Sequence, residues 1–102
     1  MQIALSGLLF DAQPFGEFVA TARATGCAAV ELRGTRLQLP PDAPPERASE
    51  LALALNGLPV ANLATHVGNF ALLDDADAEL QYALAARYVR WAAFLRATSL
   101  RV

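Results

Sequence analysis

The 102-residue chain has a single cysteine, Cys27, which excludes an intramolecular disulfide. Because Cys27 stands in an apolar run, the sequence favours a packed core thiol over a reactive one. No stretch of the chain approaches the ~18 consecutive apolar residues that a membrane span needs. Residues 1–10 also lack the basic segment and the small-residue cleavage site of a signal peptide. We therefore expect a cytoplasmic protein with no membrane-spanning segment.

Basic charge is also scarce. The chain carries 8 Lys+Arg against 10 Asp+Glu, a formal net charge of -2 and a pI near 5.2, without a basic cluster. A nucleic-acid surface is polyanionic and selects basic patches, so no nucleic-acid partner is expected. In contrast, hydrophobic residues make up 55% of the chain and its mean hydropathy is +0.32. This is rich for so small a chain and predicts surface that something else covers, as in a homo-oligomer.

The sequence lacks the signature motifs of common enzyme classes. It has no Gly-rich phosphate loop, no paired cysteines at zinc spacing, no Gly-x-Ser-x-Gly turn and no His-Glu-x-x-His pair. Asp74, Asp75 and Asp77 lack the spacing of a calcium-binding loop and fit the start of a helix, whose exposed amide groups attract negative charge. A functional site must therefore be assembled in space from separate segments.

Short apolar runs alternate with segments of helical periodicity. The predicted strands begin near residues 3, 28, 60 and 99, and the run at 27–30 is typical of a strand buried on both faces. The first predicted helix has Pro14 at its first position and stops at Gly26. The order predicts an α/β fold with a parallel β-α repeat of four strands and three helices, which is half of a TIM (β/α)8 barrel. The apolar stripes of the three helices are Phe15, Phe18, Val19 and Ala22; Ala48, Leu51, Ala52 and Leu55; and Leu80, Leu84, Tyr88, Trp91 and Leu95.

Two features fall outside this repeat. Segment 35–45 holds four prolines, which predicts a surface loop at the carboxyl end of the second strand. In the last helix, Tyr82, Val89 and Phe94 lie off the apolar stripe, so we expect neighbouring helices or a second chain to cover them.

Polar side chains gather where the predicted strands end, and ligands of parallel α/β folds bind beyond the carboxyl ends of the strands. Glu31 and Arg33 follow the second strand, and Thr65, His66 and Asn69 follow the third. Glu31 could bind a metal or move a proton, and Arg33 could clamp a carboxylate, a phosphate or a sugar hydroxyl. His66, the only histidine, could be a metal ligand, a general base or a donor to a substrate.

Structural roles for the same residues remain open. Glu31 and Arg33 could form an ion pair or a solvated turn at a strand end, and His66 could be a loop histidine bonded to a backbone carbonyl. Ser6, near the end of the first strand, is a further candidate. A working metal site needs at least three ligands, and the chain does not obviously supply them.

The run Gly26-Cys27-Ala28-Ala29-Val30-Glu31-Leu32-Arg33 resembles the Gly-x-x-x-Val-Glu-Leu-Arg second strand of the xylose-isomerase-like TIM barrels. This family includes sugar phosphate isomerases, epimerases and the relatives of endonuclease IV. Segments 64–66, 74–78, 88–95 and 100–102 are similar to its third strand, third helix and fourth strand. The family usually has Leu-Gly-Ala before the fourth strand, where this chain has Leu95-Arg96-Ala97. The likeness spans residues 1–102 as one partial domain, the amino-terminal half of a barrel.

The resemblance implies an isomerase or epimerase that acts on a sugar or keto-sugar and depends on a divalent metal (Mn, Mg or Zn). It implies catalytic roles for Glu31 and His66 and substrate contacts for Arg33, Thr65 and Asn69. Most metal ligands of such barrels come from strands four to eight, so we expect the isolated chain to be inactive and to hold no complete metal site. The alternative is a non-catalytic half-barrel that associates with itself. The endonuclease branch is disfavoured, because a DNA groove needs positive charge.

Overall fold

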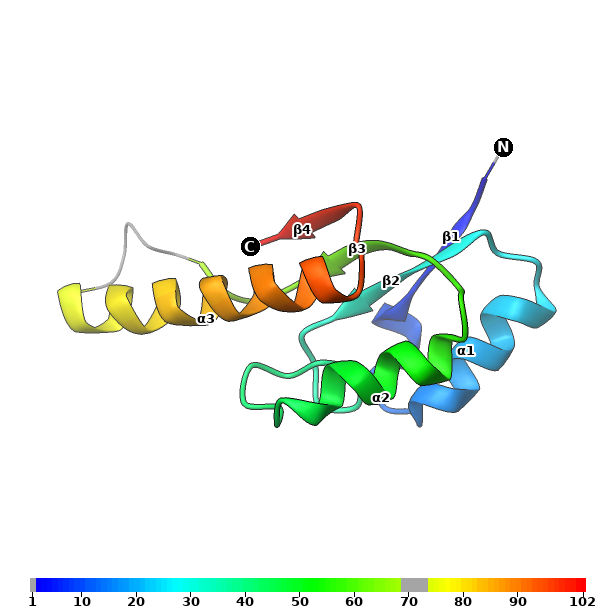
Figure 1. The fold of residues 1–102 in the computed structure, drawn as a ribbon, viewed down its shortest axis with the longest axis horizontal. Helices are drawn as coiled ribbons and strands as arrows, with labels where there is room; N and C mark the ends of the chain where they lie inside the picture. The colour runs from blue at the N-terminus through cyan, green and yellow to red at the C-terminus, as the bar shows by residue number, and fades with distance from the viewer. Residues whose placement is uncertain (1, 69–73) are drawn as a thin grey trace.

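The computed structural model describes residues 2–68 and 74–102 and shows four parallel strands in one sheet with three α-helices (Figure 1). A short 3-10 helix, η1, follows the first strand. In chain order the elements are β1 (Ala4–Ser6), η1 (Gly7–Phe10), α1 (Phe15–Ala24), β2 (Ala29–Arg33), α2 (Glu46–Leu55), β3 (Val60–Ala64), α3 (Asp75–Phe94) and β4 (Ser99–Arg101).

The strands lie side by side in chain order, β1-β2-β3-β4, and every neighbouring pair is parallel. This confirms the predicted fold, in which a helix connects each strand to the next. One irregularity interrupts the β2–β3 ladder: Val30 pairs with Val60, but Glu31 pairs with Asn62. Ala61 is therefore an extra residue in β3, and this bulge decides which side chains of β3 stand beside those of β2.

One face of the sheet carries the hydrophobic core. Val30, Leu32 and Leu63 are buried on this face and pack with the apolar stripes of the helices. Glu31 and Arg33 alternate with them in β2, point to the other face and are only partly buried. The expectation of a strand buried on both faces is therefore wrong, because the helices lie together on one side of the sheet (Figure 1).

The helices follow the predicted stripes with two differences. The start of α3 extends past the end of the sheet (Figure 1), so Leu80, a predicted core residue, is 57% exposed. Tyr88, Trp91 and Leu95, further along the same stripe, are buried as predicted. Pro14 precedes α1 as its cap, with a ψ of 143°, and is not the first helical residue. No helix within the described ranges is both long and apolar enough to span a membrane.

The segment 35–45 is only partly the surface loop that its prolines predict. Leu39 is fully buried in the core, and Gln38 is 1% exposed. Arg47 donates to the carbonyl oxygen of Gln38 at 2.8 Å, and Tyr88 donates to that of Leu39 at 2.8 Å. The prolines exclude regular structure, but the residues before them pack inward.

Left-handed residues follow the helices. Gly26 (φ 73°) follows α1, as the sequence predicts, and Asn56 (φ 47°) with Gly57 (φ 88°) follows α2. After α3 this position is taken by Arg96, with a φ of 56°. α3 therefore ends at the end of its predicted apolar stripe. The left-handed position after it is held by an arginine, whose Cβ atom disfavours this conformation.

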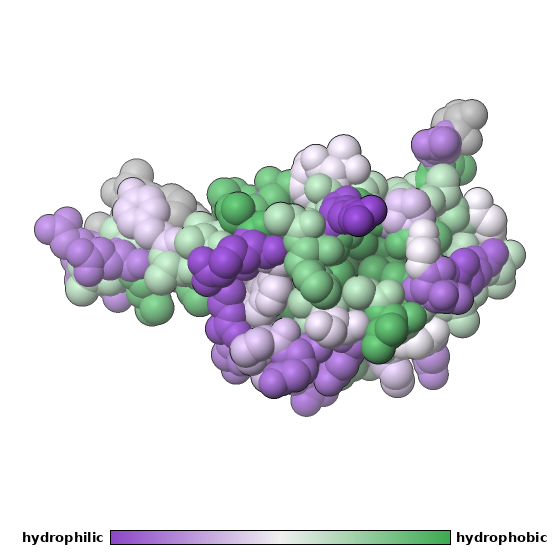
Figure 2. Space-filling model, in the orientation of Figure 1, coloured by the Kyte–Doolittle hydropathy of each residue, from purple (hydrophilic) through white to green (hydrophobic). Residues whose placement is uncertain are grey.

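Several apolar side chains remain on the surface of the single chain. Figure 2 shows hydrophobic surface in the middle of the view, with hydrophilic side chains along the lower edge and at the start of α3. Tyr82, Val89 and Phe94, the α3 residues off the stripe, are each more than half exposed. The described part of the chain therefore does not bury the second apolar side of α3.

Candidate functional site

Four polar side chains form a row across the sheet, on the face opposite the core. Ser6, Glu31, Asn62 and Ser99 are register partners on neighbouring strands. Ser6 Oγ donates to Glu31 Oε1 at 3.1 Å, and Asn62 Nδ2 donates to Glu31 Oε2 at 2.9 Å. Ser99 Oγ donates to Asn62 Oδ1 at 2.9 Å. We call these residues the polar row; both carboxylate oxygens of Glu31 are fixed within it.

A second row lies two residues further along each strand, nearer the carboxyl ends. In this row Ala64 is the register partner of both Arg33 and Arg101. We call these three residues the arginine row. The Arg33 side chain is 14% exposed, with Nη1 3.7 Å from Asp11 Oδ2 and Nη2 3.5 Å from His66 Nε2. Because a guanidinium only donates, this contact is a hydrogen bond when His66 is neutral with its proton on Nδ1.

Asp11 and Gln38 support Arg33 from the η1 side. Asp11 Oδ1 accepts hydrogen bonds from Thr35 Oγ1 at 3.0 Å and from Gln38 Nε2 at 3.3 Å. Gln38 also joins two backbones, since its Oε1 accepts from the Arg33 amide and its Nε2 donates to the Gly7 carbonyl, both at 2.9 Å. The last register pair of β1 and β2 is Ser6 with Glu31, and the Gln38 side chain joins the two backbones beyond it.

Sequence reasoning did not select Asp11 or Gln38 as site residues. Asp11 directly follows η1, which leads on from the carboxyl end of β1, so the strand-end rule could have found it. Gln38 stands in a proline-rich loop and gives no sequence signal. Its position depends on Gly7, where an added Cβ would lie 2.3 Å from Gln38 Oε1.

The selected residues divide into three groups. Arg33 and exposed His66 are brought together, and Glu31 lies on the same face of the sheet as Arg33, one step before it. Thr65 is 6% exposed, and its hydroxyl donates to the Arg101 carbonyl at 2.9 Å, so it ties β3 to β4. Asn69 lies outside the described residues.

A divalent metal does not fit the side chains described. Among residues 2–68 and 74–102, no group of three or more His, Cys, Asp and Glu side chains could hold a metal ion. Glu31 accepts hydrogen bonds from Ser6 and Asn62, and His66 Nε2 faces the cationic Arg33. A metal ligand needs a lone pair directed at the ion and away from other cations. What these groups can do is accept and donate hydrogen bonds and carry a proton.

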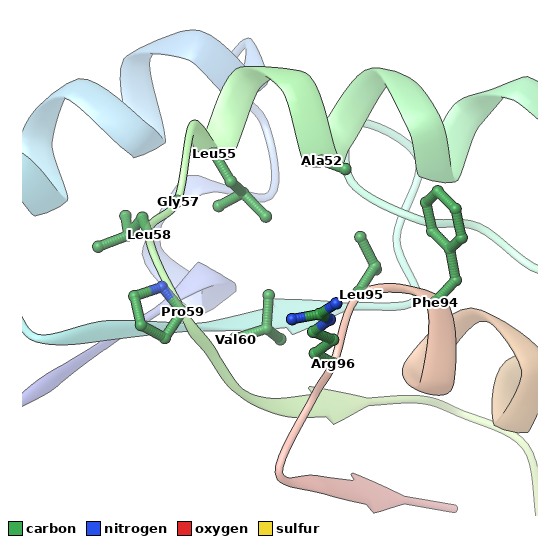
Figure 3. A pocket seen from close by; sticks show the side chains of 9 residues that line it. All are labelled: Ala52, Leu55, Gly57, Leu58, Pro59, Val60, Phe94, Leu95 and Arg96. Atoms are coloured by element: carbon green, nitrogen blue, oxygen red, sulfur yellow. The ribbon is translucent and has the colours of Figure 1, made fainter.

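Two hollows lie at opposite ends of the sheet. One of about 350 Å³ lies where α2 and α3 end and β3 begins, and its walls are apolar except for Arg96 (Figure 3). No residue of the polar row or the arginine row lines it. A smaller hollow of about 210 Å³ lies at the carboxyl end, between His66 and the α3 residues Gln81, Leu84 and Tyr88. His66 lines this second hollow, but no residue of the polar row or the arginine row does, so the candidate site is the polar face of the sheet itself and neither hollow.

Tyr88 forms part of the wall of this smaller hollow. Burial raises the pKa of Tyr88 to about 12, although the nearby positive charge of Arg87 opposes the shift. The phenol therefore stays protonated at neutral pH and donates to the Leu39 carbonyl. It positions the 35–45 segment and does not act as a base.

The chain matches no model of a known protein family and no curated protein sequence. The resemblance of residues 26–33 to the xylose-isomerase-like barrels stays a prediction, and the fold and the side-chain geometry are the findings on which a function can be argued.

Proposed function

We propose that this chain is the amino-terminal half of a sugar isomerase or epimerase of the xylose-isomerase-like type, and that its polar face binds a sugar or keto-sugar. The observation that carries the proposal is the polar row. The inward side chains of a packed barrel are mostly bulky and apolar, whereas this sheet places Ser6, Glu31, Asn62 and Ser99 together. Alternating hydroxyl, carboxylate and amide groups match the donors and acceptors of a polyol.

Glu31 is the proton acceptor in this proposal. Each of its oxygens receives one hydrogen bond, from Ser6 or Asn62, and keeps lone-pair capacity for a substrate hydroxyl or a transferred proton. His66 and Arg33, nearer the carboxyl ends of the strands, would bind a carbonyl or hydroxyl oxygen of the same substrate.

The divalent metal of such enzymes would supply electrophilic activation of the keto group, and it does not fit the described side chains of this chain. We therefore propose that the isolated chain binds without turnover. A cytoplasmic location belongs to the same proposal, because a chain with one cysteine needs no oxidising compartment.

The test is titration of the ¹⁵N-labelled chain with D-fructose and D-glucitol. We expect amide shifts along β2 and β3 that disappear in Glu31→Gln but persist in Glu79→Gln, an exposed control on α3. Shifts confined to other elements, or unchanged in Glu31→Gln, would contradict polyol binding by the polar row. Keto-sugar turnover by the purified chain would contradict the proposal that it is a catalytically incomplete half.

A second candidate function is a non-catalytic half-barrel that associates with itself. It is supported by the strand order, which leaves β1 and β4 as edge strands, and by the exposure of Val89 and Phe94. Sedimentation velocity should then show a dimer or larger species that Val89→Glu weakens and Leu53→Glu, an exposed apolar control on α2, does not. A clean monomer at high concentration would exclude this function.

A further inference from the structure

The arginine row places two arginine residues on either side of an alanine. Arg33 on β2 and Arg101 on β4 are both register partners of Ala64 on β3, so all three side chains project from the polar face. Neighbouring strands lie ~4.8 Å apart, which puts the two arginine Cα atoms roughly 10 Å from each other. The small side chain of Ala64 leaves the space between them to the two long side chains.

Arg33 is held in place without short hydrogen bonds to its guanidinium. Its contacts to Asp11 and His66 are 3.7 and 3.5 Å, whereas charge-assisted N–H···O bonds measure ~2.7–2.9 Å. Its Nε is buried and has no partner within the described part of the chain. Arg101 forms no ion pair with any described residue. The row therefore holds cationic donors that the chain itself leaves unsaturated.

The charges around the row favour one negative charge on a ligand. Asp11 is fixed by Thr35 and Gln38 and places one carboxylate near the Arg33 guanidinium, whereas Arg101 has no such counter-charge among the described residues. Glu31, in the next row, is held by its own neighbours, and a second negative charge close to both carboxylates would be repelled. A planar carboxylate matches the guanidinium fork and carries a single charge.

We propose that the arginine row binds the carboxylate of a polyhydroxy acid whose hydroxyl groups lie along the polar row. The inference rests on the proposed function for the polar row and adds the substrate class, a sugar acid in place of a neutral sugar. Arg33 and Arg101 are the specificity-determining residues, and His66 limits the rotation of Arg33.

The experiment compares D-gluconate with D-glucitol, which has a similar chain of hydroxyl groups without the charge, by calorimetric titration at constant ionic strength. We expect gluconate to bind at least about tenfold more tightly, since a charge-assisted bidentate pair contributes at least the ~1.4 kcal/mol that corresponds to this factor. Arg33→Gln and Arg101→Gln should each reduce gluconate affinity toward that of glucitol. Arg90→Gln, which removes one exposed positive charge from α3, should leave the preference unchanged.

The outcomes separate this inference from the proposed function. Equal affinity for gluconate and glucitol overturns the inference, and so does a preference for gluconate that persists in both Arg33→Gln and Arg101→Gln. The proposed function still holds in either case if glucitol binding depends on Glu31. Tighter binding of D-glucitol 6-phosphate than of gluconate overturns the assignment to a carboxylate. If Arg33→Gln fails to fold, Arg101→Gln decides the result, because Arg101 is exposed and its side chain supports no other described residue.

Discussion

The side-chain amide of Asn62 donates to Glu31 Oε2 at 2.9 Å and joins β3 to β2 on the face opposite the core. This contact depends on the bulge at Ala61. In an unbroken ladder Glu31 would pair with Ala61, and Asn62 would pair with Leu32, so its side chain would point to the core face. One extra residue therefore brings an amide to the carboxylate and completes the polar row.

The first prediction concerns this contact. Asn62→Ala should lower the free energy of unfolding by about 1–2 kcal/mol, because the Glu31 carboxylate loses one of its two donors. Ser99→Ala, which removes bonds to uncharged oxygens, should cost no more than about 1 kcal/mol. Urea unfolding at pH 7 measures both values. Equal stability of Asn62→Ala and the parent chain would contradict a contribution of the polar row to folding.

The second prediction tests Gln38 as a link between backbones. Gln38→Leu should destabilise the chain by about 2–4 kcal/mol, because the Arg33 amide and the Gly7 carbonyl both lose their partner in a buried place. Gln13→Leu makes the same chemical change at an exposed position and should stay within about 0.5 kcal/mol of the parent chain. Similar urea midpoints for the two variants would show that water replaces Gln38.

The sequence was sufficient for the parallel sheet because its signals are local. Each apolar run is followed by a helical stripe, and Gly26 and Asn56 stand where left-handed residues end α1 and α2. The strand-end rule located Glu31, Arg33 and His66 for the same reason, since a parallel sheet brings the carboxyl ends of its strands to one edge.

The contacts of the site depend on long-range geometry, which the sequence does not reveal. The bulge at Ala61 selects Asn62 as the partner of Glu31, and no composition signal marks it. Gln38 reaches Gly7 across 31 positions of the chain. The exposure of Leu80 has a similar cause, since a stripe indicates a side of the helix but not how far the sheet beneath it extends.

The third prediction uses the left-handed residue after α3. Arg96→Gly should stabilise the chain by about 0.5–1 kcal/mol, because glycine adopts a φ of 56° without the steric cost of a Cβ atom. Arg90→Gly removes the same side chain inside the helix and should instead destabilise by about 1 kcal/mol. Thermal and urea unfolding distinguish the two signs. A loss of stability in Arg96→Gly would show that the Arg96 side chain contributes more packing than its backbone conformation costs.

The fourth prediction follows from the raised pKa of Tyr88. Burial raises this pKa to about 12, whereas tyrosine in an unfolded chain ionises near pH ~10. The folded state therefore has the full benefit of the neutral phenol below pH ~10 and loses about 1.4 kcal/mol per pH unit as the pH rises toward 12. Tyr88→Phe should remove this alkaline loss, at a cost of about 1 kcal/mol at neutral pH for the bond to Leu39.

Urea unfolding at several pH values from 8 to 12 tests this prediction, together with phenolate absorbance of the folded chain. The control is Tyr82→Phe, which removes a hydroxyl from a side chain that is 60% exposed and should keep the alkaline loss of the parent chain. If the free energy of unfolding falls with pH in the same way in the parent chain and in Tyr88→Phe, the prediction is wrong. Water would then reach the phenol, and Tyr88 would not be packed between α3 and the 35–45 segment.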